Sequence, residues 1–121
     1  MSQLTVMVTV MHPHPDRREQ FMDVDFLVDT GATYVVLPPD VVDRLGLEIR
    51  MHKRIRLASG ELGLWGLGDV HLRLNGEEHT TTFLAGPRGS RPLFGAYGLE
   101  LFWLTVDPVH QRLVKAPPGL V

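Results

Sequence analysis

Short stretches in which apolar and polar residues alternate follow one another along most of this chain. A period of two residues is typical of β-strands with one buried face. The clearest case is 21–28, where the even-numbered residues are apolar while Asp23 and Asp25 fall on the opposite face. The predicted strands are 4–10, 21–28, 34–37, 54–57, 62–65, 69–74, 79–85, 103–106 and 111–114.

Turn signals separate these strands, and helical signals are few. Asn75-Gly76 is a strong hairpin signal, and Ala58 to Glu61 predicts a second tight turn. A short helix is expected over 38–46, opened by proline and closed by glycine, and another over 97–101. Closely spaced strands with little helix predict an all-β fold, a small barrel or sandwich, with one or two short helices.

Length and composition narrow the class of protein. The 121 residues suffice for one domain, which we expect to span 1–121, and 44% apolar with 21% charged residues is ordinary globular composition. A net charge of -2 predicts no general affinity for nucleic acid or anionic membranes, and the absence of cysteine excludes disulfides and thiol catalysis. With no signal peptide and no membrane-spanning apolar run, the expected location is the cytoplasm.

One carboxylate stands in an unusual setting. Asp29 follows three large apolar residues, Phe26 to Val28, and precedes Thr30 and Gly31. Burying a carboxylate costs several kcal/mol unless it is neutralised or hydrogen-bonded, so a chain that places one here is expected to use it. The following hydroxyl and glycine offer a supporting hydrogen bond and a close backbone approach.

Two later features complete a pattern with this motif. The first is the turn at Ala58 to Glu61, which contains a glycine. The second is Leu93-Phe94-Gly95, and Leu99 follows its glycine by four positions. Together with Asp-Thr-Gly-Ala at 29–32, they resemble the single-domain aspartic proteases of the retropepsin-like family, over roughly residues 4–114. The resemblance implies a small closed acid-protease barrel in which a flap hairpin covers the substrate and the 93–95 element passes behind the catalytic loop.

The resemblance also implies roles for individual residues. Asp29 would be the catalytic carboxylate, the Thr30 hydroxyl would lock two loops together, and Gly31 would offer its N–H near the carboxylate. No metal and no cofactor is expected, and the partner is a polypeptide substrate. The expected substrate-binding residues are Ala32, Thr33, Ala58, Ser59, Gly60 and Glu61.

The chain carries only half of the carboxylate pair that this chemistry needs. None of its other aspartates is followed by Thr-Gly or Ser-Gly. Because the reaction uses two carboxylates that share one proton, we expect an obligatory homodimer with Asp29 from each chain on the twofold axis. Viral members hold their loops with a salt bridge between an acidic residue and an arginine, but Thr33 and Ala96 occupy those positions here.

Two other functional classes stay open. The same fold would serve as a peptide-binding or dimerisation module with weak or no proteolysis, since the salt bridge is missing. A nucleic-acid binder would use the basic stretch of Arg50, Lys53, Arg54 and Arg56, although a solvated strand face is the preferred interpretation.

Neither the histidines nor the tryptophans predict a further functional site. We expect His12 and His14, flanked by prolines, to be solvated rather than a metal pair. We also expect His71 and His79 to lie on facing arms of a hairpin without an acidic partner, which argues against zinc. Trp65 and Trp103 are expected in the core or a dimer interface.

Overall fold

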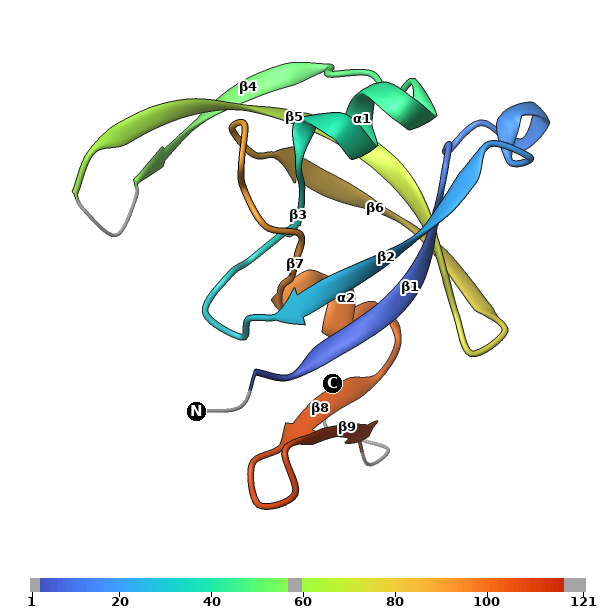
Figure 1. Ribbon diagram of the computed structural model, residues 1–121, viewed down its shortest axis with the longest axis vertical. Coiled ribbons are helices and arrows are strands. Elements are labelled where there is room, and N and C mark those ends of the chain that lie inside the picture. Colours follow the sequence, from blue (N-terminus) through green and yellow to red (C-terminus); the bar gives the residue numbers. More distant parts are fainter. Residues whose placement is uncertain (1–2, 57–59, 117–121) are drawn as a thin grey trace.

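The strands pair into one sheet that closes on itself. The computed structural model describes residues 3–56 and 60–116. The neighbours around the ring are, in order, β1 (Thr5–Met11), β2 (Phe21–Val28), β7 (Leu93–Phe94), β3 (Val35–Leu37), β6 (Glu77–Ala85) and β5 (Leu62–Leu74). β1 then pairs with β5 through Thr9 to Met11, which closes the ring (Figure 1). The expectation of an all-β closed barrel is confirmed.

The flap hairpin is built from β4 (Met51–Arg56) and the first half of β5. Figure 1 shows this pair of strands reaching away from the barrel. The sequence predicted two strands, 62–65 and 69–74, where the structure has one continuous strand. Gly66, Leu67 and Gly68 are buried and fully paired, because β5 passes from β4 to β6 at this point without leaving the sheet. β5 therefore couples the flap rigidly to the barrel wall.

Short helices lie where the sequence placed them. α1 (Pro39–Leu45) buries Val41, Val42 and Leu45 and ends at Gly46, and α2 (Ala96–Leu101) follows β7 directly. A single 3-10 turn, η1 (Pro15–Arg17), interrupts the loop after β1. Asn75 and Gly76 both have positive φ, 52° and 80°, as the tight hairpin turn between β5 and β6 requires.

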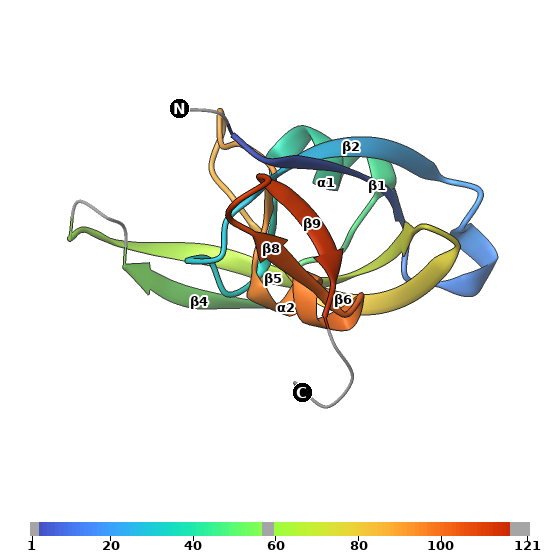
Figure 2. The same cartoon turned by 90° about the horizontal axis from the view of Figure 1, so that it is seen from below.

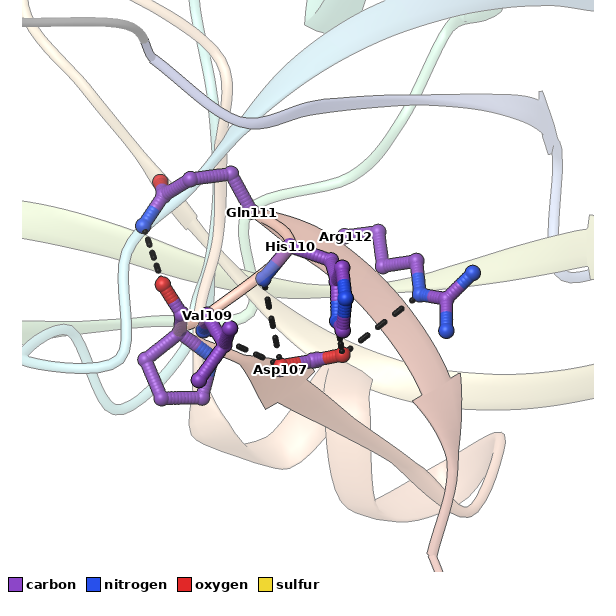
Figure 3. A network of polar contacts seen from close by, with 6 residues as sticks. Asp107, Val109, His110, Gln111 and Arg112 are labelled. Carbon is purple, nitrogen blue, oxygen red and sulfur yellow. Dashed lines mark hydrogen bonds and ion pairs between the residues drawn. The ribbon is translucent and has the colours of Figure 1, made fainter.

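A separate two-stranded hairpin of β8 (Leu104–Asp107) and β9 (Arg112–Lys115) follows α2. Seen from below, it lies in front of α2 (Figure 2). Its turn is organised by Asp107, whose carboxylate accepts the N–H groups of Val109 and His110 and the His110 side chain at 2.7 Å (Figure 3). The His110 hydrogen bond, with the two backbone donors, holds the pKa of Asp107 below its ordinary value.

Aromatic side chains fill the barrel. Phe26, Phe83 and Phe94 have no exposed surface, and Phe26 meets Phe94 edge to face at 5.4 Å. A smaller cluster of Val36, Leu67 and Leu84 lies between the barrel and the flap. Trp65 packs against this cluster, whereas Trp103 is 45% exposed and is not a core residue.

Two phenylalanines of β2 allow a matched test of the core. Phe26→Ala should lower the free energy of unfolding by about 3–5 kcal/mol, because it leaves a cavity among the buried rings. Phe21→Ala, on the opposite face and 56% exposed, should change it by no more than about 0.5 kcal/mol. Urea denaturation at one fixed protein concentration measures both. Equal losses in the two variants would contradict the assignment of the core face.

Candidate active site

The topology brings Asp29 to the end of β2, beside a strand that is remote in sequence. β2 and β7 run parallel, with Leu27 opposite Leu93 and Val28 opposite Phe94. The Asp29 N–H continues this ladder and donates to the carbonyl of Phe94 at 3.1 Å. The position of Asp29 is therefore set by backbone pairing with the later apolar element.

A tight loop holds the Asp29 carboxylate. Its Oδ1 accepts the Gly31 N–H at 3.0 Å, and the Asp29 carbonyl accepts the Ala32 N–H at 3.1 Å. The side chain is half-buried, while Thr30 and Gly31 are exposed. A carboxylate oriented by a backbone donor and open to solvent on one side is suited to act on a bound ligand.

The segment after β7 fastens this loop from behind. The Ala96 N–H donates to the Ala32 carbonyl at 2.8 Å, and the Tyr97 N–H donates to the Thr33 carbonyl at 2.9 Å. Gly95 makes the approach possible, since a Cβ there would stand 2.4 Å from the Tyr34 carbonyl oxygen. The structure thus joins 29–34 to 93–97, the two segments on which the sequence argument rested.

The residues predicted to surround the carboxylate have different positions. Ala32 is half-buried and its neighbour Thr33 is exposed. Within the described parts of the chain, nothing hydrogen-bonds the exposed Thr30 hydroxyl, which leaves it available for a contact outside the protomer. Thr33 and Ala96 form no salt bridge, and backbone hydrogen bonds hold the loop in its place.

The structure describes only part of the predicted flap turn. Ala58 and Ser59 lie outside the described residues. Gly60 and Glu61 are exposed, and the Arg56 guanidinium donates to the Gly60 carbonyl at 3.2 Å.

Sequence reasoning missed a contact between the flap and the Asp29 loop. The ammonium group of Lys53 on β4 donates to the Tyr34 hydroxyl at 3.2 Å and lies 5.3 Å from the centre of its ring. Tyr34 in turn meets Tyr97 edge to face at 5.3 Å. Side chains alternate along β4, so Lys53 and Arg54 lie on opposite faces of the strand. This alternation is the signal in the sequence that separates Lys53 from the rest of the basic stretch.

The basic stretch is in fact divided. Arg50 pairs with Asp69 at 3.4 Å, and Lys53 contacts Tyr34. Arg54 is exposed on the other face of β4, opposite Leu64 in the register. The structure therefore does not gather these cations on one face of the strand.

The two hairpin histidines also differ from expectation. His71 lies opposite Thr80 and His79 opposite Leu72, so the two rings belong to opposite faces of the hairpin. His71 has an acidic partner, because its Nε2 lies 2.8 Å from Glu78, and this hydrogen bond holds the pKa of Glu78 below its ordinary value. Within 3–56 and 60–116, no group of three potential ligand side chains is arranged to hold a metal ion.

Comparisons with known proteins agree with this architecture. A family model described as aspartyl protease matches residues 20–92, more than half of the chain. The match includes the Asp29 loop and the flap and ends just before Leu93. The chain therefore belongs to the aspartyl protease family. No curated protein gives a significant sequence match.

Solved structures show the same fold at low sequence identity. The EIAV protease in complex with the inhibitor HBY-793 is 19% identical, with a TM-score of 0.64 over 82% of this chain and 86% of that one. The retroviral protease-like domain of Ddi1 from Leishmania major is 17% identical, with a TM-score of 0.63 over 100% and 99%. A retropepsin-like aspartic protease from Rickettsia conorii is 18% identical, with a TM-score of 0.57 over 89% and 91%. The fold is retropepsin-like, as the sequence motifs implied.

A cavity lies away from the Asp29 loop. It has a volume of about 380 Å³ and is lined by charged and histidine side chains together with two prolines. The lining residues are His12, Pro13, His14, Pro15, Glu48, Arg50 and Asp69.

No described helix is long and apolar enough to cross a membrane.

His12 contradicts the expectation of a solvated loop histidine. It is only 6% exposed, and its Nδ1 accepts the His14 N–H at 3.0 Å. Burial, assisted by the nearby charge of Arg17, lowers the pKa of His12 below its ordinary value of 6.5, while Glu48 acts in the opposite direction. Proline and charge predicted exposure, but the fold brings Gly46 and Glu48, which are remote in sequence, close to the ring.

The buried His12 should make stability depend on pH. The His12 ring binds a proton more readily in the unfolded chain than in the folded one. The free energy of unfolding should therefore fall as the pH drops below 6.5. The contribution of His12 to this fall should end once the pH is below the lowered pKa of the folded state. His12→Asn keeps an acceptor for the His14 N–H and should flatten the decline; His52→Asn, at an exposed position, should not. Denaturation from pH 7.5 to 5 measures this. A wild-type slope retained in His12→Asn would show that other groups cause it.

Proposed function

We propose that this chain is an aspartic endopeptidase whose two catalytic carboxylates are contributed by Asp29 of two identical subunits. The observation that carries the proposal is the geometry of Asp29. Its carboxylate is oriented by the Gly31 N–H, on a loop fixed by backbone bonds to 94–97, in a chain of the aspartyl protease family. The substrate is a polypeptide, bound as an extended strand beneath the flaps.

The chemistry follows from two carboxylates that share one proton. The ionised carboxylate removes a proton from a water molecule, and the water oxygen attacks the carbonyl carbon of the peptide bond. The protonated carboxyl hydrogen-bonds the carbonyl oxygen as negative charge develops there. Collapse of the tetrahedral intermediate breaks the C–N bond, and the leaving amine takes a proton from a carboxyl group. Because like charges this close do not both ionise readily, the pair titrates as a unit.

Neighbouring residues have supporting roles in this proposal. The exposed Thr30 hydroxyl contacts its counterpart loop across the twofold axis, where an isologous interface places equivalent residues together. Gly31 orients the carboxylate, and no cofactor takes part. The residues proposed to border the substrate backbone are Ala32, Thr33, Ala58, Ser59, Gly60 and Glu61.

A second candidate function rests on Thr33 and Ala96. Without the salt bridge at these positions, subunit association depends on other contacts, and a weakly associating chain would bind peptides without cutting them. Peptide binding that is unaffected by Asp29→Asn, with no cleavage at any pH, would favour this module. Domain limits at 1–121 and a cytoplasmic location remain predictions.

The catalytic role of Asp29 is tested by an isosteric substitution. Digestion of a peptide library at about pH 4–6, where a shared-proton pair operates, should yield cleavage that falls about 100- to 10,000-fold in Asp29→Asn, because the general base is lost. Asp25→Asn, an exposed carboxylate on the same strand β2, should retain activity. Undiminished cleavage by Asp29→Asn would rule out Asp29 as the catalyst.

The shared site is tested by mixing subunits. Sedimentation velocity at micromolar concentration should show a dimer, and activity per chain should fall on dilution because a lone subunit holds half of the site. Excess Asp29→Asn chain, left to exchange with wild type, should suppress activity by forming mixed dimers, whereas excess Asp25→Asn should not. A protein that stays monomeric and active at every concentration would exclude a site formed by two chains.

A further inference from the structure

Lys53 stands out because the partner of its ammonium group is the neutral side chain of Tyr34. It is exposed on β4, and it contacts the hydroxyl and the ring face of Tyr34. Among the described residues, no carboxylate lies within ion-pair distance of it. Arg50, near the beginning of the same hairpin, contrasts with it because Asp69 compensates its charge at 3.4 Å. Within 3–56 and 60–116, Lys53 is thus a cation held in place without a counter-ion.

The flap presents this cation on its inner face. Side chains alternate along a strand, so Lys53 shares a face of β4 with Ile55 and lies opposite Trp65 of β5 in the register. Ile55 and Trp65 pack against the cluster between the flap and the barrel. His52, Arg54 and Arg56 occupy the outer face. Lys53 is therefore the member of the basic stretch directed at the Asp29 loop.

Tyr34 joins this cation to the candidate catalytic loop. It follows Asp29 by five positions, and its carbonyl lies in the close contact with Gly95 that fastens the loop. Its ring rests against Tyr97, which also anchors the loop through its N–H. The Lys53–Tyr34 contact consequently joins the flap to the candidate catalytic loop.

We propose that Lys53 selects substrates that carry an aspartate or glutamate side chain, which replaces the Tyr34 hydroxyl as the partner of the ammonium group. The inference rests on the proposed function, since it assigns a substrate class to that same site. In a twofold dimer, one Lys53 lies on each side of the scissile bond. The selected peptides should therefore carry acidic residues at symmetrical positions before and after the cut.

Physical chemistry favours the exchange. A carboxylate offers a charge-assisted hydrogen bond, which is roughly twice as strong as a bond to a neutral phenol. A peptide lying beneath the flap also excludes water, and the attraction between opposite charges rises as the local dielectric constant falls. A difference of about tenfold in kcat/KM between acidic and neutral peptides corresponds to one such bond.

The test compares peptides that differ in charge alone. Cleavage sites are first mapped with a peptide library, and matched peptides are then made with Glu, Gln or Lys at the positions flanking the cut. Wild type should prefer Glu over Gln by about tenfold in kcat/KM. Lys53→Met should bring the kcat/KM of Glu peptides down to that of the matched Gln peptides, and Lys53→Glu should reverse the preference toward Lys peptides. Arg54→Met, on the outer face of the same strand, should keep the wild-type preference.

Other outcomes would overturn the proposal. If wild type shows no preference for Glu peptides, or if Lys53→Met keeps that preference, Lys53 does not determine substrate specificity. A uniform loss across Glu, Gln and Lys peptides in Lys53→Met would show that the residue only positions the flap. Tyr34→Phe separates the two roles, because it removes the hydroxyl acceptor and should leave the Glu preference intact.

A binding measurement keeps this test distinct from that of catalysis. If wild type cuts no peptide, the proposed protease activity fails, but fluorescence anisotropy with labelled library peptides still reports recognition. Stronger binding of Glu than Gln peptides, lost in Lys53→Met, would support the role of Lys53 in a binding module. Equal binding of both would contradict it.

Discussion

Backbone hydrogen bonds between the Asp29 loop and the segment after β7 hold the candidate site together. Asp29 donates to Phe94, while Ala96 and Tyr97 donate to the loop carbonyls. These bonds need the loop and the segment to approach so closely that Gly95 has no room for a side chain. Because the contact uses main-chain groups, it does not depend on the side chains of Thr33 and Ala96.

The barrel topology brings the Asp29 loop and the segment after β7 together. β2 and β7 are parallel neighbours, so the ends of both strands point the same way and the chain must travel through β3 to β6 before it returns. The packing of Phe26 against Phe94 fixes the two strands from inside. A half-buried carboxylate at the end of β2 is thereby supported by a rigid core, which is the condition for precise catalytic geometry.

The flap is held against the barrel by a second set of contacts, which includes the polar contact between Lys53 and Tyr34. β5 continues from the barrel wall into the hairpin, and Lys53 contacts Tyr34. The flap is therefore joined to the barrel through the sheet, through the packing of Ile55 and Trp65 against the smaller apolar cluster, and through the Lys53–Tyr34 contact. A side-chain contact of this kind exchanges easily with a ligand, whereas the backbone ladder of β5 does not.

Local patterns in the sequence determined the strands, the short helices, the Asn75-Gly76 turn and the single Asp-Thr-Gly motif at Asp29. They succeeded because periodicity and turn chemistry act over a few neighbouring residues. The continuity of β5, the burial of His12 and the contact of Lys53 with Tyr34 were decided by tertiary structure. Each depends on which distant segment packs against a given face, and local periodicity carries no record of that partner. Asp29 was recognisable from its neighbours in the chain, but the groups that orient and face it were assembled only by folding.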